Sequence, residues 1–70
     1  MEKKKYNRIK AVLAEKSTLS KDLAKHLEVT DETASRWASN SAQPSIATLF
    51  QIANFLEVDV RTLLVSNLQS

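Results

Sequence analysis

Side chains suited to catalysis or metal binding are scarce in this sequence. It contains one histidine, His26, and no cysteine. Without cysteine neither a disulfide nor a thiolate zinc site can form, and one histidine does not hold a metal by itself. No second histidine, cysteine or obvious nucleophile partner is apparent for His26, which we place at the exposed edge of a helix. The sequence therefore predicts a protein that is not an enzyme and has no metal or other cofactor.

Basic residues gather at the N-terminal end of the chain. Residues 2–10 carry five cations and one acid, whereas residues 11–70 carry five cations and seven acids. Such a basic end attracts phosphate, and Lys3, Lys4 and Lys5 are its centre. A solubilising tail explains the same run of charge equally well.

The length and the apolar pattern bound the class of protein. No apolar run approaches the roughly 20 residues that cross a bilayer, and the N-terminus lacks the apolar stretch of a signal peptide. We therefore expect a cytoplasmic protein with no membrane partner. Its 70 residues make one domain, near the lower limit for a core without metal or disulfides. We expect a basic arm at 1–5, a folded domain at 6–66 and a frayed C-terminus at 67–70.

Apolar residues recur at helical spacing along the chain. Glycine is absent, proline occurs once, at Pro44, and no alternating strand pattern persists. The predicted fold class is all-α. The expected helices lie at about 6–16, at about 20–27, at about 31–39, in a fourth segment that begins after Ser45, and in a short fifth segment that begins after Asp59.

Polar residues mark the expected helix ends. Ser20 or Thr18 is available to cap the second helix, and Thr30 caps the third, where acidic residues follow at the positive end of the helix dipole. Ser45 can cap the fourth helix and Asp59 the fifth. Asn40 is a suitable left-handed stop. Apolar positions expected to face the core are Ile9, Val12, Leu13, Leu23, Ala24, Leu27, Val60, Leu63 and Leu64, together with Tyr6 at the edge of the first helix.

The fourth helix is apolar around much of its circumference. Its apolar residues are Ile46, Leu49, Phe50, Ile52, Ala53, Phe55 and Leu56. Such a helix is either buried on several sides or shared with a partner. Phe50 and Phe55 lie about 140° apart around the helix, so one core face does not cover both fully.

Four strings carry a resemblance to a known family. They are Asn7-Arg8-Ile9-Lys10, Asp-Leu-Ala-Lys-His-Leu-Glu-Val-Thr at 22–30, Ala34-Ser35-Arg36-Trp37, and Gln-Pro-Ser-Ile-Ala-Thr-Leu at 43–49. Together they closely resemble the Cro/lambda-repressor-like family, also called the XRE family, over about residues 7–64. The resemblance implies a compact five-helix lambda-repressor-like domain with a helix-turn-helix at about 20–39. It also implies that Ala24 lets the two helices approach, that Val29 fills the turn, and that Trp37 packs in or against the core.

The resemblance further implies double-stranded DNA as the partner, with the third helix in the major groove. The base-reading positions of the family fall on Asp31, Glu32, Ser35 and Arg36. Its phosphate contacts fall on Ser20, Lys21, Thr30, Ser39, Asn40, Ser41 and Gln43. From charge and position alone, a further hypothesis is that Lys3, Lys4 and Lys5 form an arm that reaches around the duplex, as the N-terminal arms of some relatives do. Arg36 can bind guanine through O6 and N7, or it can pair with Glu32 one turn earlier, and the sequence leaves both open.

The sequence departs from the family at four informative positions. Glu28 and Glu57 replace glycines in the turn and after the fourth helix, so a left-handed backbone there costs about 1 kcal/mol each. Asp31 and Glu32 place carboxylates where the groove is read, and these repel phosphate and accept hydrogen bonds only, for instance from cytosine N4. These carboxylates lower the nonspecific affinity for DNA and can sharpen specificity. Alternatively, they indicate a family member that binds DNA poorly.

Two functions follow from these observations. The leading interpretation is a sequence-specific transcriptional regulator, a repressor or control protein, which binds an inverted repeat as a homodimer. Its candidate dimer contacts are Phe55, Val60 and Val65, although Phe55 serves equally well as an extension of the core. The alternative is an antitoxin or antirepressor that keeps the fold, binds a protein partner and has lost the operator.

Overall fold

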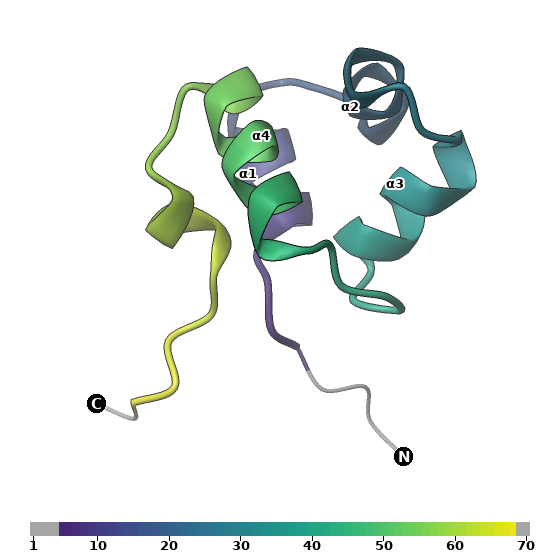
Figure 1. The fold of residues 1–70 in the computed structure, drawn as a ribbon. Helices are drawn as coiled ribbons and strands as arrows, with labels where there is room; N and C mark the ends of the chain where they lie inside the picture. The colour runs from purple at the N-terminus through teal and green to yellow at the C-terminus, as the bar shows by residue number, and fades with distance from the viewer. Residues whose placement is uncertain (1–4, 69–70) are drawn as a thin grey trace.

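Within residues 5–68, four α-helices and one 3-10 turn follow one another (Figure 1). The computed structural model describes residues 5–68, with α1 at Ile9–Glu15, α2 at Ser20–Leu27, α3 at Asp31–Ala38, α4 at Ile46–Leu56 and the turn η1 at Val60–Leu63. Over this range no strand forms, and an isolated antiparallel bridge joins Asn7 to Leu64. The all-α prediction is confirmed, and the expected fifth helix is a single 3-10 turn. No helix between residues 5 and 68 has the length and apolar character to cross a membrane.

The helices pack around one shared hydrophobic core. The most extensive packing joins α2 to α3, while α2 also contacts α4, and η1 contacts both α4 and α1. In Figure 1 the chain before α1 and the chain after η1 leave the helices toward the same side. The antiparallel bridge between Asn7 and Leu64 joins these two segments close to where they leave the helices.

The first helix begins later than the sequence predicts. It starts at Ile9 rather than at residue 6, because the preceding residues pair with the last residue of η1 and with the segment after it. The Arg8 N–H donates to the Leu63 carbonyl at 2.8 Å, and the Val65 N–H donates to the Tyr6 carbonyl at 3.0 Å. Tyr6 consequently lies outside the helix and is exposed, so its assignment to the core face of the first helix is wrong.

Three of the predicted caps are confirmed and one is wrong. The side chains of Thr30, Ser45 and Asp59 each accept a backbone hydrogen bond at the start of α3, α4 and η1. The α2 helix has no hydroxyl cap, because its N-cap is Leu19 and Ser20 is already helical. Instead, the Leu19 N–H donates to the Asp22 carboxylate at 3.3 Å. Asp22 thus places negative charge at the positive end of α2.

The exposed cap of η1 is reinforced by a side-chain pair. Asp59 Oδ1 accepts from the Arg61 N–H at 2.8 Å and from Arg61 Nε at 3.0 Å, and Oδ2 accepts from the guanidinium at 3.1 Å. These hydrogen bonds from Arg61 lower the pKa of Asp59 below its ordinary value and raise the pKa of Arg61. Because both groups are exposed, the pair contributes little to stability.

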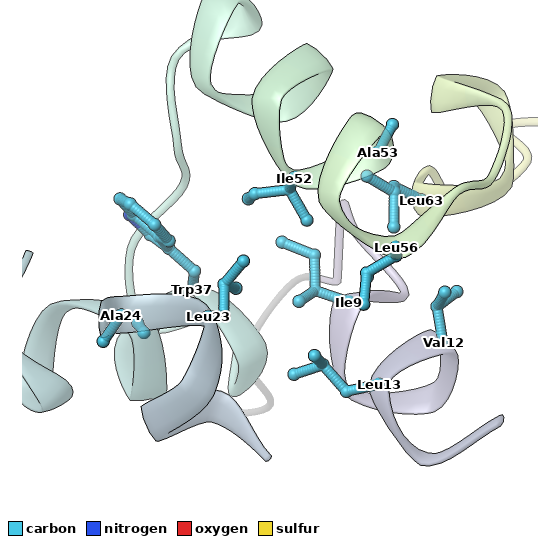
Figure 2. Close-up of a cluster of buried hydrophobic side chains, with 11 residues drawn as sticks. Ile9, Val12, Leu13, Leu23, Ala24, Trp37, Ile52, Ala53, Leu56 and Leu63 are labelled. Carbon is cyan, nitrogen blue, oxygen red and sulfur yellow. The ribbon is translucent and has the colours of Figure 1, made fainter. Parts of the chain in front are cut away.

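The core draws on every helix (Figure 2). Its buried members are Ile9, Val12, Leu13, Leu23, Ala24, Ala34, Trp37, Ile52, Ala53, Leu56 and Leu63. The core position predicted for Trp37 is confirmed, since only 8% of its surface is exposed. Leu64 is an error of the sequence prediction, because the backbone becomes extended at this residue and its side chain is exposed.

The broad apolar surface of α4 is divided between core and solvent. Ile52, Ala53 and Leu56 are buried, whereas Ile46 is 75% and Phe50 53% exposed. Phe55 is half-buried and stacks on the ring of His26 from α2, with ring centroids 4.4 Å apart. The core therefore covers one phenylalanine only in part and leaves the other outside, as the angular spacing predicts.

Four residues in the described part of the chain adopt a left-handed backbone although none is glycine. They are Ser17, Glu28, Asn40 and Glu57, with φ between 52° and 63°. Glu28 and Glu57 terminate α2 and α4 as C-caps, so the backbone keeps the conformation that glycine favours although glycine is absent. The stop predicted at Asn40 is confirmed, and the left-handed Ser17 was missed.

We predict that Glu28→Gly and Glu57→Gly each stabilise the domain. Removing the clash between Cβ and the carbonyl in the left-handed conformation is worth about 1 kcal/mol per site. Urea unfolding of each variant measures this gain. Lys25→Gly, inside α2 on an exposed position, is the matched control and is expected to lose about 0.5–1 kcal/mol. A Glu57→Gly protein less stable than the wild type contradicts the assignment of strain.

Candidate nucleic-acid interface

The α2–turn–α3 unit is built around two small buried residues. Ala24 and Ala34 are fully buried where α2 and α3 cross, and such small side chains allow two helix backbones to approach closely. Between the helices, the Val29 N–H donates to the Ala24 carbonyl at 2.9 Å, and the Val29 side chain packs against the core. The turn at Glu28 is therefore stabilised by the backbone bond between Val29 and Ala24 and by the packing of the Val29 side chain.

One face of α3 is directed to solvent along its whole length. Ala34 and Trp37 are buried on the inner side, while Asp31, Glu32, Ser35 and Arg36 are all exposed. The four residues predicted to read bases therefore share one exposed helix face. Thr30, predicted to contact phosphate, caps this helix by accepting from the Thr33 N–H at 3.1 Å.

Arg36 is paired with a neighbour on the same helix. Its guanidinium donates to Glu32 Oε2 at 2.9 Å, and the two side chains remain 60% and 74% exposed. An exposed pair at this spacing contributes about 0.3–0.5 kcal/mol. The pair orients the arginine but is weak enough to exchange for a stronger acceptor.

The loop after α3 is stiffened by its own polar groups. The Ser41 N–H donates to the Arg36 carbonyl at 2.9 Å, and the hydroxyls of Ser39 and Ser41 are 2.9 Å apart. Asn40 Oδ1 accepts from Gln43 Nε2 at 3.1 Å. Four of the predicted phosphate contacts, Ser39, Asn40, Ser41 and Gln43, thus lie in one ordered loop, and each uses side-chain atoms in internal hydrogen bonds.

Asn7 is the residue of this region that sequence reasoning missed as a functional position. It is the one buried polar side chain among residues 5–68. Its Nδ2 donates to the Trp37 carbonyl at 3.0 Å and to Gln43 Oε1 at 2.8 Å, and its Oδ1 accepts from the Ile9 N–H at 3.0 Å. An asparagine directly before an apolar helix start was the available signal. Asn7 fixes the end of α3 and the following loop to the start of α1.

The comparisons with known proteins agree with this geometry. A family model described as helix-turn-helix matches residues 9–63, which is most of the chain. The chain belongs to the XRE-type helix-turn-helix family. A crystal structure from Bacteroides fragilis, of a protein provisionally assigned as DNA-binding, is similar at 46% identity and a TM-score of 0.83, covering 84% of this chain and 95% of that one. A comparison with curated protein sequences finds no match.

In this helix-turn-helix protein, hydrogen bonds fix the segment before α1. The N–H groups of Tyr6 and Asn7 both donate to Asn40 Oδ1, at 2.9 Å and 3.1 Å, and Asn40 Nδ2 returns a bond to the Asn7 carbonyl at 3.1 Å. The chain before α1 is therefore tied to the loop after α3. Of the predicted arm, Lys5 is exposed next to this junction, while Lys3 and Lys4 lie outside the described residues.

The remaining predicted phosphate contacts of this helix-turn-helix protein lie at the start of α2. Ser20 is half-buried and Lys21 is exposed. Because the cap residue Leu19 has no polar side chain, the first amides of α2 receive no hydroxyl cap. Within residues 5–68 no cluster of histidine, cysteine and acidic residues could hold a metal ion.

Two of the three predicted dimer contacts are less accessible than expected. Phe55 and Val60 are half-buried and pack against the core, whereas Val65 is 41% exposed. The larger exposed apolar side chains of α4 are Ile46 and Phe50.

Proposed function

We propose that this helix-turn-helix protein is a sequence-specific regulator of transcription, a repressor or control protein that places α3 in the major groove of double-stranded DNA. The observation that supports the proposal most is the exposed face of α3, on which Asp31, Glu32, Ser35 and Arg36 are aligned. An α-helix with its side chains is about 10–12 Å across. A helix of this size fits the major groove, which is about 12 Å wide.

The chemistry of this face suits recognition of base edges. Arg36 donates through a planar fork that matches O6 and N7 of guanine, and the carboxylates of Asp31 and Glu32 accept from cytosine N4. On a guanine, Arg36 exchanges its bond to Glu32 for two bonds to the base. Glu32 is then available to accept from a neighbouring base.

Selection of bound sequences from random duplex DNA tests the proposal. Wild-type protein at near-physiological salt is expected to enrich a symmetric motif, and Arg36→Ala is expected to lose part of that motif while keeping the fold. Weak retention without sequence preference, equal in the two proteins, contradicts operator recognition. That outcome favours the second candidate function, an antitoxin or antirepressor that binds a protein partner, for which the acidic start of α3 is the motivating feature.

We further propose that two copies bind an inverted repeat and meet through the outer face of α4. This helix has no charged residue, and Ile46 and Phe50 are exposed one turn apart. An uncharged face can meet its own copy across a two-fold axis without like-charge repulsion. The domain measures 35 Å along its longest axis, so copies centred on half-sites about 34 Å apart are close enough to touch.

Phe50→Glu is expected to weaken self-association. A carboxylate on the two-fold axis meets its own copy and loses water, which costs about 2 kcal/mol or more at a central contact. Sedimentation equilibrium at concentrations where the wild type is dimeric measures the change. Leu19→Glu, an equally exposed apolar position outside α4, is the control and should remain dimeric. An unchanged dimer in the Phe50 variant excludes this face.

A further inference from the structure

The predicted DNA-facing residues of α2, α3 and the following loop carry no net positive charge. The charged residues among them are Lys21, Asp31, Glu32 and Arg36, two cations and two acids, and Arg36 is paired with Glu32. Neutralisation of phosphates by lysine and arginine supplies most nonspecific affinity for DNA. A neutral reading surface therefore needs cations from another part of the domain.

Two shallow hollows beside this surface meet at Lys10 of α1. The smaller, about 230 Å³, is lined by Lys10 together with Ser20, Ser35 and Ser39. The larger, about 600 Å³, runs from Lys10 to Lys5 along the N-terminal segment. The side chain of Lys10 is thus adjacent to three residues predicted to contact DNA, although it belongs to a helix outside the helix-turn-helix.

The lining of the two hollows has charged residues of one sign only, beside apolar side chains of alanine, valine and leucine. It contains Lys5, Arg8 and Lys10 with several hydroxyls, and no aspartate or glutamate contributes to either hollow. Arg8 is partly engaged, since its guanidinium lies 3.7 Å from Glu15. For Lys5 and Lys10, no carboxylate of residues 5–68 lies within ion-pair distance. The cations and hydroxyls of this groove match the oxygens of a phosphodiester backbone.

We propose that Lys10 and Lys5 form a phosphate-binding groove on α1, which holds the DNA backbone beside the helix-turn-helix and supplies the cationic charge that the reading surface lacks. This inference rests on the proposed function, because it requires that α3 face the duplex. Ser39 lines both hollows and lies on the loop after α3. One backbone strand can therefore pass from the loop onto α1 without leaving the surface.

The salt dependence of binding to a mixed-sequence DNA duplex tests the groove. Each lost phosphate contact lowers the slope of log K against log salt by about 0.9. We expect Lys10→Ala to lower the slope by about 0.9 and the Lys5→Ala, Lys10→Ala pair by about 1.8. At 0.1 M salt the single variant should bind about eightfold more weakly, taking affinity at 1 M salt as unchanged.

Lys16→Ala is the matched control. Lys16 is an exposed lysine at the end of the same helix and lines neither hollow, so it should leave the slope as in the wild type. Equal slopes for wild type and Lys10→Ala overturn the groove, as does an equal loss in Lys16→Ala, which would reflect net charge alone. Failure of the wild type to bind any duplex overturns the proposed function as well. Circular dichroism melts confirm that all variants are folded.

Discussion

Replacing Asn7 by alanine is expected to lower the free energy of unfolding by about 2–4 kcal/mol, the largest effect of any polar substitution considered for this domain. The side chain bonds three partners from a buried position, namely the Trp37 carbonyl, the Gln43 amide and the Ile9 N–H. Each buried group left without a partner costs about 1–3 kcal/mol. Small domains have total stabilities near the lower end of about 5–15 kcal/mol, so the variant should approach the threshold of folding. Urea unfolding measures the loss.

Two further variants separate the hydrogen bonds from mere size. Asn54→Ala removes an exposed asparagine of α4 and is expected to change stability by less than about 0.5 kcal/mol. Asn7→Asp keeps the shape and the acceptor for the Ile9 N–H, but it directs a carboxylate oxygen at two carbonyl oxygens and should be at least as damaging as alanine. An Asn7→Ala protein as stable as Asn54→Ala would show that the network contributes no net stability.

The Asn7 network also explains which parts of the site the sequence could not predict. Cap residues and core periodicity are local properties, so the start of α3 at Thr30 and the burial of Trp37 follow from short windows of sequence. The bonds from Asn7 and Tyr6 to Asn40 join residues more than 30 positions apart. No local pattern encodes such a pairing, and it delays the start of α1 to Ile9.

The fourth helix shows a second limit of sequence reasoning. Its wide apolar surface correctly predicts both burial and an exposed remainder, but not which residues take each role. Helical spacing fixes only relative angles, and the packing of α2 and η1 decides which side is covered. Phe55 stacks on His26 and is half-buried, whereas Phe50 is exposed to solvent. Deciding whether Phe50 or Phe55 is the surface residue therefore requires knowledge of the tertiary structure.

Arg36→Ala is expected to reduce affinity for the selected operator by about 1–3 kcal/mol, or roughly five- to 150-fold, while affinity for unrelated duplexes changes little. The reason is that a bidentate contact to guanine depends on sequence, whereas a phosphate contact does not. Fluorescence anisotropy titrations with operator and unrelated duplexes give both affinities. Arg61→Ala is the control, because Arg61 is likewise an exposed arginine paired with a carboxylate, that of Asp59 in the cap of η1. An equal loss on both duplexes would place Arg36 on the backbone rather than on a base.

Glu32→Gln completes this test, because Glu32 both holds Arg36 and repels phosphate. The amide removes one negative charge from the DNA-facing surface and weakens the bond to Arg36, now 2.9 Å long. Affinity for unrelated duplexes is then expected to rise more than affinity for the operator, so the ratio of the two falls. Adding Arg36→Ala to Glu32→Gln should give less than the sum of the single effects on the operator, since residues in direct contact are not independent. Strict additivity would mean that the ion pair on α3 has no part in recognition, and Asp31 would become the carboxylate that shapes specificity.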